Sequence, residues 1–397
     1  MPYKTEIYDG ITYQMERIGN TFYVYAYDAD GQEIGHGRSG LVQTNINGAV
    51  VKALANGAVA TEPNFRRGGI ARNCFRMLNS VIAEEDVLLS YLHPFSFNYY
   101  RTMGYERVAD HRELIFPITN LSFLPRFTNM IRCKSTDDAT PITEAYHRFC
   151  QGRNILFRRD GATCTLEPKV LGRYLSGGIY EYNCRDHQIF YSKDENGNAN
   201  GYLILRRVME GRDHMLFGEI HVEELGFDSP QTLRNILGFL RVYEGEVDRI
   251  KICNCAMAPE VEKVLKGYKY TDIRVVADLQ ARIHNVEKLL AVMVYPKAPG
   301  AFTVKVTDCP KSPYDKENTE GTWRVEYADG KATVTRLADS AEYDLSAPMP
   351  AFTQLIHGYE SGSAQLARYM EGVELKNDCE DFFRAFPCRP NGLFELF

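Results

Sequence analysis

The feature that most constrains the fold is a single strand-to-helix junction near residue 65. A strand predicted over Ala49–Thr61 runs into a short loop, and a helix with apolar residues at helical spacing starts at Ile70. Such a junction leaves the first amides of the helix unpaired, at the end where the helix dipole favours a phosphate group. The loop between them contains two arginines and two glycines, which are Arg66, Arg67, Gly68 and Gly69. It predicts either a phosphate-binding site or an ordinary turn with solvated arginines.

The spacing of the loop distinguishes it from other phosphate-binding motifs. It is neither G-x-G-x-x-G nor the Walker loop, because no Lys-Ser/Thr pair follows the glycines. The pattern Arg66-x-x-Gly69-x-Ala71 instead resembles the acyl-CoA pyrophosphate loop of the GNAT N-acetyltransferases. The resemblance implies that acetyl-CoA is the co-substrate and that the backbone of residues 58–61 polarises its carbonyl. The cofactor-binding residues that it implies are Val59, Thr61, Arg66, Arg67, Gly68, Gly69 and Ala71.

A second motif contains three tyrosines, Tyr99, Tyr100 and Tyr105, around Gly104. It is similar to the aromatic helix-and-turn motif that follows the loop, helix and strand in GNAT enzymes. The resemblance makes Tyr100 the catalytic acid that protonates the departing thiolate, and a phenol with a pKa near 10 keeps its proton at neutral pH. The alternative is that these rings are core residues. Nearby His93 is expected to be structural, because a lone histidine at a strand end is more often structural than catalytic.

The order of predicted elements repeats along the chain, and the sequence as a whole resembles the Eis-like branch of the GNAT enzymes. The fold class expected is α/β (α+β). The resemblance implies a catalytic GNAT domain over residues 1–128, a second GNAT-like domain over 129–288 and a sterol-carrier-like (SCP2-like) α+β domain over 289–397. Thr61 replaces a valine of the branch's loop, and the second domain lacks the loop, with acidic Glu224 near its position. The second domain is therefore expected to be a scaffold that binds no CoA.

The branch also uses a C-terminal carboxylate as the catalytic base, which here implies Phe397. The apolar side chains near this end favour a docked tail. The alternative is simple packing of the last residues on their own domain.

Composition narrows the class of protein. The net charge of −6 argues against a nucleic-acid surface, and no apolar run has the length of a membrane span, so a cytoplasmic protein is expected. The ten cysteines are expected to be reduced. Cys253 and Cys255 point to opposite faces of a strand and lack partners at zinc spacing, so no metal site is expected.

The function predicted is direct acetyl transfer to a primary amine of a small molecule. By resemblance the acceptor is a polyamine of the aminoglycoside or lysine type, and the assembly is a homo-oligomer, a hexamer. Two alternatives remain: a carrier of lipid or hydrophobic ligands that uses the third domain, with vestigial GNAT units, and a transferase that prefers longer acyl chains.

Overall fold

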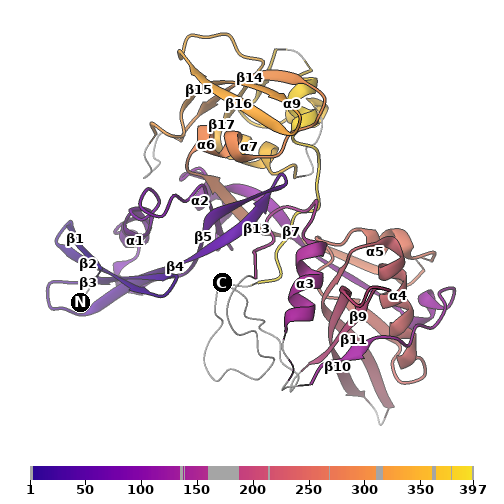
Figure 1. Cartoon of the computed structure of the whole chain (residues 1–397). Helices are drawn as coiled ribbons and strands as arrows, with labels where there is room; N and C mark the ends of the chain where they lie inside the picture. The colour runs from indigo at the N-terminus through magenta and orange to yellow at the C-terminus, as the bar shows by residue number, and fades with distance from the viewer. Residues whose placement is uncertain are drawn as a thin grey trace. The chain divides into compact units, whose positions relative to one another are not determined.

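The computed structural model describes residues 3–134, 137, 139–159, 187–212, 215–267, 269–309, 316–359, 364–376 and 378–395. It is a mixed α/β protein in which strands predominate (Figure 1). In the described ranges no helix is both long and apolar enough to cross a bilayer. Eight of the ten cysteines lie in these ranges, and all eight are free thiols.

The chain forms two compact units. Among the described residues, the first unit contains those within 3–109 and 278–391, and the second unit contains those within 110–277 and 392–395. The predicted division into domains over 1–128, 129–288 and 289–397 stays a prediction.

The larger sheet of the first unit has the order β1-β2-β3-β4-β5-β6-β13. Neighbours in this sheet are antiparallel except β5 and β6, which are parallel. The strands are β1 (Lys4–Tyr8), β2 (Ile11–Ile18), β3 (Thr21–Tyr27), β4 (Glu33–Ile46), β5 (Ala49–Thr61), β6 (Leu89–Leu92) and β13 (Asp272–Ile283), whose residues from Asp278 onward belong to this unit.

Two helices of this sheet follow β5 and β6. Helix α1 (Ile70–Asn79) packs against β2 to β5, and its buried face includes Cys74 and Leu78, as the helical spacing predicts (Figure 1). Glycine at position 35 makes this approach possible, because a Cβ there would lie 2.7 Å from Ile70. Helix α2 (Phe97–Arg101) is short and capped by Ser96, whose Oγ accepts a hydrogen bond from the Tyr99 amide.

The smaller sheet of the first unit has the order β16-β15-β14-β17-β18. Helix α7 packs on β14 and β17, and most of its apolar side chains are buried. The elements are α6 (Val286–Val292), β14 (Gly300–Thr307), β15 (Gly321–Ala328), β16 (Lys331–Leu337), β17 (Leu345–Pro348), α7 (Met349–Ile356), α8 (Ala364–Ala367), β18 (Glu374–Leu375) and α9 (Glu380–Ala385).

The second unit contains a sheet of the order β7-β12-β11-β10-β9-β8, and only β11 and β12 are parallel. The elements are β7 (Glu106–Pro117), β8 (Ile131–Arg132), α3 (Thr140–Phe149), β9 (Gln188–Lys193), β10 (Ala199–Arg212), β11 (Met215–Phe227), α4 (Pro230–Leu240), β12 (Arg249–Ile252) and α5 (Glu260–Val264). The predicted repeat is visible, since a helix connects two parallel strands in each unit: α1 between β5 and β6, and α4 between β11 and β12.

The closing strands of the two units are exchanged. The sequence pattern predicts Glu106–Phe116 as the last strand of the N-terminal region, but its residues from Asp110 belong to the second unit, where they pair with β12. In the first unit the corresponding place beside β6 is taken by β13, with Gln280 opposite Leu92. A strand from late in the chain therefore completes the N-terminal sheet.

Candidate active site

A cavity of about 760 Å³ lies in the first unit, between the end of β5, the start of α1 and the segment around α2. Of the predicted cofactor residues, it brings together Val59, Thr61, Arg66, Arg67, Gly69 and Ala71. Gly68 belongs to the same loop but not to the lining. The other described residues of the lining are Ala60, Phe65, Ile70, Arg72, Phe95, Tyr99, Thr102 and Met103.

The cavity opens where β5 separates from its parallel neighbour. The pairing of β5 with β6 covers Ala53–Asn56 only, so the following residues of β5 have no strand on this side in the described chain. A β-bulge in β5 lies next to this separation. Two observations indicate it: the register of β5 with β4 shifts between His36 and Arg38, and Ala58 adopts a left-handed φ of 49°. Residues 59–61 therefore lie at the cavity wall, paired with β4 on one side and with no described strand on the other.

The start of α1 is uncapped. Its N-cap is Gly69, with a left-handed φ of 85°, and no side chain caps the helix. The Asn73 amide donates to the Gly69 carbonyl, but the amides of Ile70, Ala71 and Arg72 have no acceptor among the described residues. These amides lie at the positive end of the helix dipole, where an anion is stabilised.

The loop itself uses some of its amides internally. The Arg66 amide donates to the Pro63 carbonyl and the Gly68 amide to the Phe65 carbonyl, whereas the Arg67 amide has no acceptor in the described part of the chain. Arg67 has a left-handed φ of 68°, a conformation that is strained for a side chain other than glycine. The donors available to an anion are therefore the amides of Arg67 and of the first helical turn.

Three arginines give the cavity its charge. Arg66, Arg67 and Arg72 all line it, and none of the described lining residues is acidic. Sequence reasoning missed Arg72, whose guanidinium lies close to the helix start: a Cβ added to Gly69 would be 3.2 Å from its Nη2. A cation in the first turn opposes the helix dipole, and this unfavourable placement was the available sequence clue to a bound anion.

The predicted acid, Tyr100, lies behind the wall of the cavity. It is 4% exposed and packs in a cluster with Phe75 and Tyr105. Its ring contacts Phe95 and Tyr99, which both line the cavity, at centroid distances of 5.3 and 5.1 Å. Burial raises the pKa of Tyr100 above its ordinary value of 10, so the hydroxyl keeps its proton. The pKa of Tyr99 is also raised by burial, although the nearby Arg72 opposes this shift.

The remaining candidates lie elsewhere. His93 does not line the cavity; its Nδ1 is 2.9 Å from Oδ1 of Asp278. Phe397 lies outside the described residues, so its predicted role as base is not placed.

A group of possible metal ligands lies in the second unit: His221, Glu223 and Cys253. Two of them already have protein partners, because His221 contacts Glu219 and Glu223 contacts Arg206. Burial also raises the pKa of the Cys253 thiol, which disfavours the thiolate that binds metals.

The second unit differs from the first at the equivalent junction. Its helix α4 is capped, since Ser229 Oγ accepts a hydrogen bond from the Thr232 amide, and the Thr232 hydroxyl donates to Asp228. Asp228 also places a carboxylate where a phosphate would approach. This helix start is therefore capped by a side chain and carries a carboxylate, unlike that of α1.

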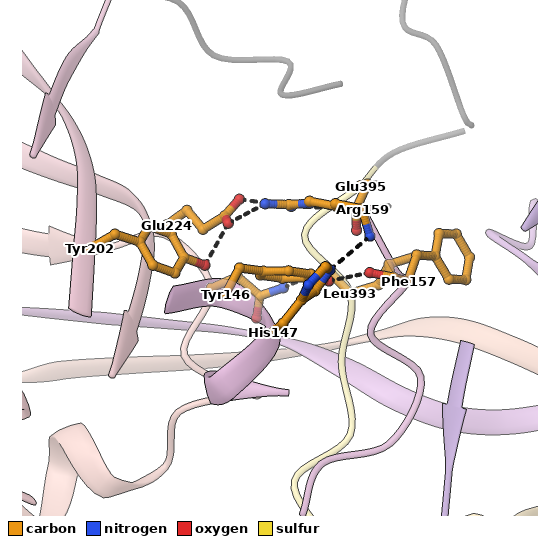
Figure 2. A network of polar contacts seen from close by, with 9 residues as sticks. Tyr146, His147, Phe157, Arg159, Tyr202, Glu224, Leu393 and Glu395 are labelled. Carbon is orange, nitrogen blue, oxygen red and sulfur yellow. Dashed lines mark hydrogen bonds and ion pairs between the residues drawn. The ribbon is translucent and has the colours of Figure 1, made fainter. Parts of the chain in front are cut away.

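A polar network is buried in the second unit, beside its hydrophobic core (Figure 2). Arg159 pairs with Glu224 through two hydrogen bonds of 2.6 and 3.1 Å, and Tyr202 donates to the same carboxylate at 2.6 Å. Glu395, near the end of the chain, binds Arg159 at 2.8 Å. Both Arg159 and Glu224 are buried, so this pair occupies space that an open ligand site would need.

Comparison with known proteins identifies the N-terminal part of the first unit. Residues 3–108 match the family model described as an acetyltransferase (GNAT) domain. The chain carries a GNAT acetyltransferase domain. This domain makes the protein an N-acetyltransferase, and GNAT domains use acetyl-CoA as co-substrate.

Solved structures share the GNAT fold over nearly the whole chain. A probable N-acyltransferase from Enterococcus faecalis, a conserved protein of unknown function, is 20% identical with a TM-score of 0.73, over 95% of this chain and 89% of that one. A GCN5-related N-acetyltransferase from Anabaena variabilis is 15% identical with a TM-score of 0.73, over 94% and 89%. Eis1 from Mycobacterium abscessus is 15% identical with a TM-score of 0.70, over 96% and 92%. A search of curated proteins finds no significant match.

Proposed function

We propose that the protein is an Eis-like enzyme that transfers an acetyl group directly from acetyl-CoA to a primary amine of an aminoglycoside-type or lysine-type substrate. One observation supports the cofactor site above all: the uncapped start of α1 lies beside three arginines, in a cavity whose described lining has no acidic residue. A diphosphate fits this combination, because open amides and guanidinium groups both donate hydrogen bonds to its oxygens.

The proposed reaction uses backbone groups of the cavity wall and Tyr100, which lies directly behind that wall. Acetyl-CoA supplies an activated thioester, whose acetyl carbonyl is polarised by the backbone amides of residues 59–61. The amine nitrogen forms a bond to the carbonyl carbon, and the carbon–sulfur bond then breaks. The departing thiolate takes the proton of Tyr100, which is restored from solvent, and the amine nitrogen loses a proton to a base.

The acid is proposed to be Tyr100 and not the adjacent Tyr99. Tyr100 occupies the position that the motif gives to the acid, and its raised pKa maintains the neutral donor form. Tyr99 lines the cavity and is the natural comparison. The kcat of Tyr100→Phe should fall about 10²-fold or more, whereas Tyr99→Phe should retain most of it. The opposite ranking would transfer the role to Tyr99.

The base and the accessory parts rest on the resemblance and on the sequence pattern. The carboxylate at Phe397, the SCP2-like character of residues 289–397, the hexamer and the cytoplasmic location all stay predictions. For the base, removal of Phe397 should lower kcat without weakening CoA binding; unchanged kcat would remove it from the mechanism.

Calorimetry with CoA tests the cofactor site directly. The intact protein should bind one CoA per chain, and Arg66→Ala combined with Arg67→Ala should weaken binding at least tenfold. A carrier with vestigial GNAT units would instead show no CoA binding. Rates with acetyl-CoA and propionyl-CoA, measured against a panel of aminoglycosides and lysine derivatives, then separate the acyl and amine preferences.

A further inference from the structure

Four polar residues follow one another at alternate positions along the end of β13. They are Asp278, Gln280, Arg282 and His284. Alternate residues of a strand point to the same face, so these side chains form one row. Gln280 and Arg282 are fully buried and His284 nearly so. Buried polar groups need partners, so the contacts of the row indicate what it stabilises.

The partners of the row lie in the segment that includes α2. Gln280 Nε2 donates to the Phe97 carbonyl at 3.3 Å, and Arg282 Nη1 donates to the Met103 carbonyl at 2.6 Å. These two carbonyls bracket α2, one in its first residue and one just after its end. Tyr100 lies between them.

The outer members of the row bind on either side of these contacts. Asp278 is bonded to His93, and His284 Nε2 is 2.8 Å from Ser90 Oγ. The Ser90 hydroxyl is in turn 2.6 Å from the Tyr105 hydroxyl, and the ring of Tyr105 contacts that of Tyr100. Three members of the row, Gln280, Arg282 and His284, therefore contact the surroundings of one tyrosine, directly or through Ser90.

Arg282 is itself rigidly held. Its guanidinium forms a doubly hydrogen-bonded pair with buried Asp308, at 3.2 and 2.7 Å, and Asp308 also accepts a hydrogen bond from Thr319 at 2.6 Å. Gly104 provides the space for this guanidinium, because a Cβ at that position would lie 1.7 Å from Arg282 Nη1. The turn after α2 is thus clamped against a fixed cation.

We propose that Gln280 and Arg282 are positioning residues that hold α2 so that Tyr100 is aimed at the departing thiolate. This inference rests on the proposed function, in which Tyr100 is the acid. A helix of five residues has little stability of its own, so its orientation depends on such external contacts. A small displacement of a catalytic group is enough to reduce the rate strongly.

A double-mutant cycle tests the proposal. Gln280→Met is the main variant, because the Gln280 Oε1 has no partner among the described residues and the side chain can be replaced at similar volume. We expect kcat to fall about tenfold while the Kd for CoA stays unchanged, since the cofactor loop is not touched. In a Tyr100→Phe background the same substitution should cause no further loss of kcat, because the group that it positions is already gone.

Matched variants exclude a general effect on folding. Thr322→Val removes another fully buried hydroxyl, on β15 of the smaller sheet, and should leave kcat unchanged in both backgrounds. Arg282→Lys keeps a cation opposite Asp308 but loses the forked geometry, and should show the same dependence on Tyr100 as Gln280→Met.

The outcomes separate the inference from the function on which it rests. Equal losses of kcat from Gln280→Met with and without the Tyr100 hydroxyl would overturn the positioning role and leave the acid in place. Unchanged kcat in Tyr100→Phe itself would overturn the acid, and the positioning role with it.

Discussion

Replacement of Gly104 by alanine should strongly destabilise the first unit. Gly104 has a left-handed φ of 88°, which costs an L-residue about 1–2 kcal/mol. The new Cβ would also lie 1.7 Å from Nη1 of Arg282, so the guanidinium must leave its bonds to Asp308 and to the Met103 carbonyl. Disrupting a buried ion pair costs about 3–5 kcal/mol.

The sum is about 4–7 kcal/mol, a large part of the stability of a typical domain. For a unit of this size it corresponds to a fall of about 10 °C or more in the thermal midpoint, measured by circular dichroism. Gly10→Ala is the control, because Gly10 also has a left-handed φ, 77°, but nothing lies within 4 Å of its added Cβ. Similar falls in the thermal midpoint of both variants would show that backbone strain alone accounts for the effect and that the clash with Arg282 contributes nothing.

Arg72→Ala should weaken CoA binding by about tenfold in calorimetry, whereas Arg76→Ala, one turn later and stacked on an aromatic ring outside the cavity, should not. Burial raises the pKa of Tyr100 above its ordinary value of 10, so its hydroxyl loses its proton only above pH 10. The pH profile of kcat should therefore show no descending limb from this group up to pH 10. A descending limb below pH 10 that disappears in Tyr100→Phe would contradict this prediction. Arg159→Met should destabilise the second unit by about 3–5 kcal/mol in denaturant unfolding, because Glu224 is left buried without a cation, and adding Glu224→Gln should recover part of the loss. No recovery would refute this account.

The sequence predicts the elements around the cofactor loop well, because local rules decide them. The run Ala49–Thr61 is the strand that the pattern indicates, and α1 begins at Ile70 directly after the two glycines. The backbone at position 69 is left-handed, which favours glycine there. The spacing of apolar residues in α1 determines which face of this helix is buried. The GNAT domain that these elements suggest is confirmed by the family match.

The sequence does not predict β13, and the reason is physical. Its inward positions include polar residues such as Gln280 and Arg282, so hydrophobic alternation marks the strand poorly. These residues are stabilised in the core by carbonyls of Phe97 and Met103, which are far away in the chain. Partners at such separation leave no trace in a local pattern.

The opening of the chain shows a second limit. The residues from Lys4 to Ile18 form the antiparallel pair β1 and β2, which no motif in the sequence predicts. At the site, the motif singles out Tyr100, whereas it is the adjacent Tyr99 that lines the cavity. Successive residues of a helix point about 100° apart, so only the three-dimensional placement of α2 separates their roles.

The exchanged strand β13 also bears on how the protein is made. Gln280 takes its place opposite Leu92 only after about 190 further residues have been synthesised, which at ordinary elongation rates is roughly 10–40 s. During that time β6 is a bare edge on the ribosome-bound chain, open to aberrant pairing with other nascent polypeptides. Expression of the N-terminal region alone would make this temporary state permanent, so a catalytic fragment needs residues 278–309 supplied with it.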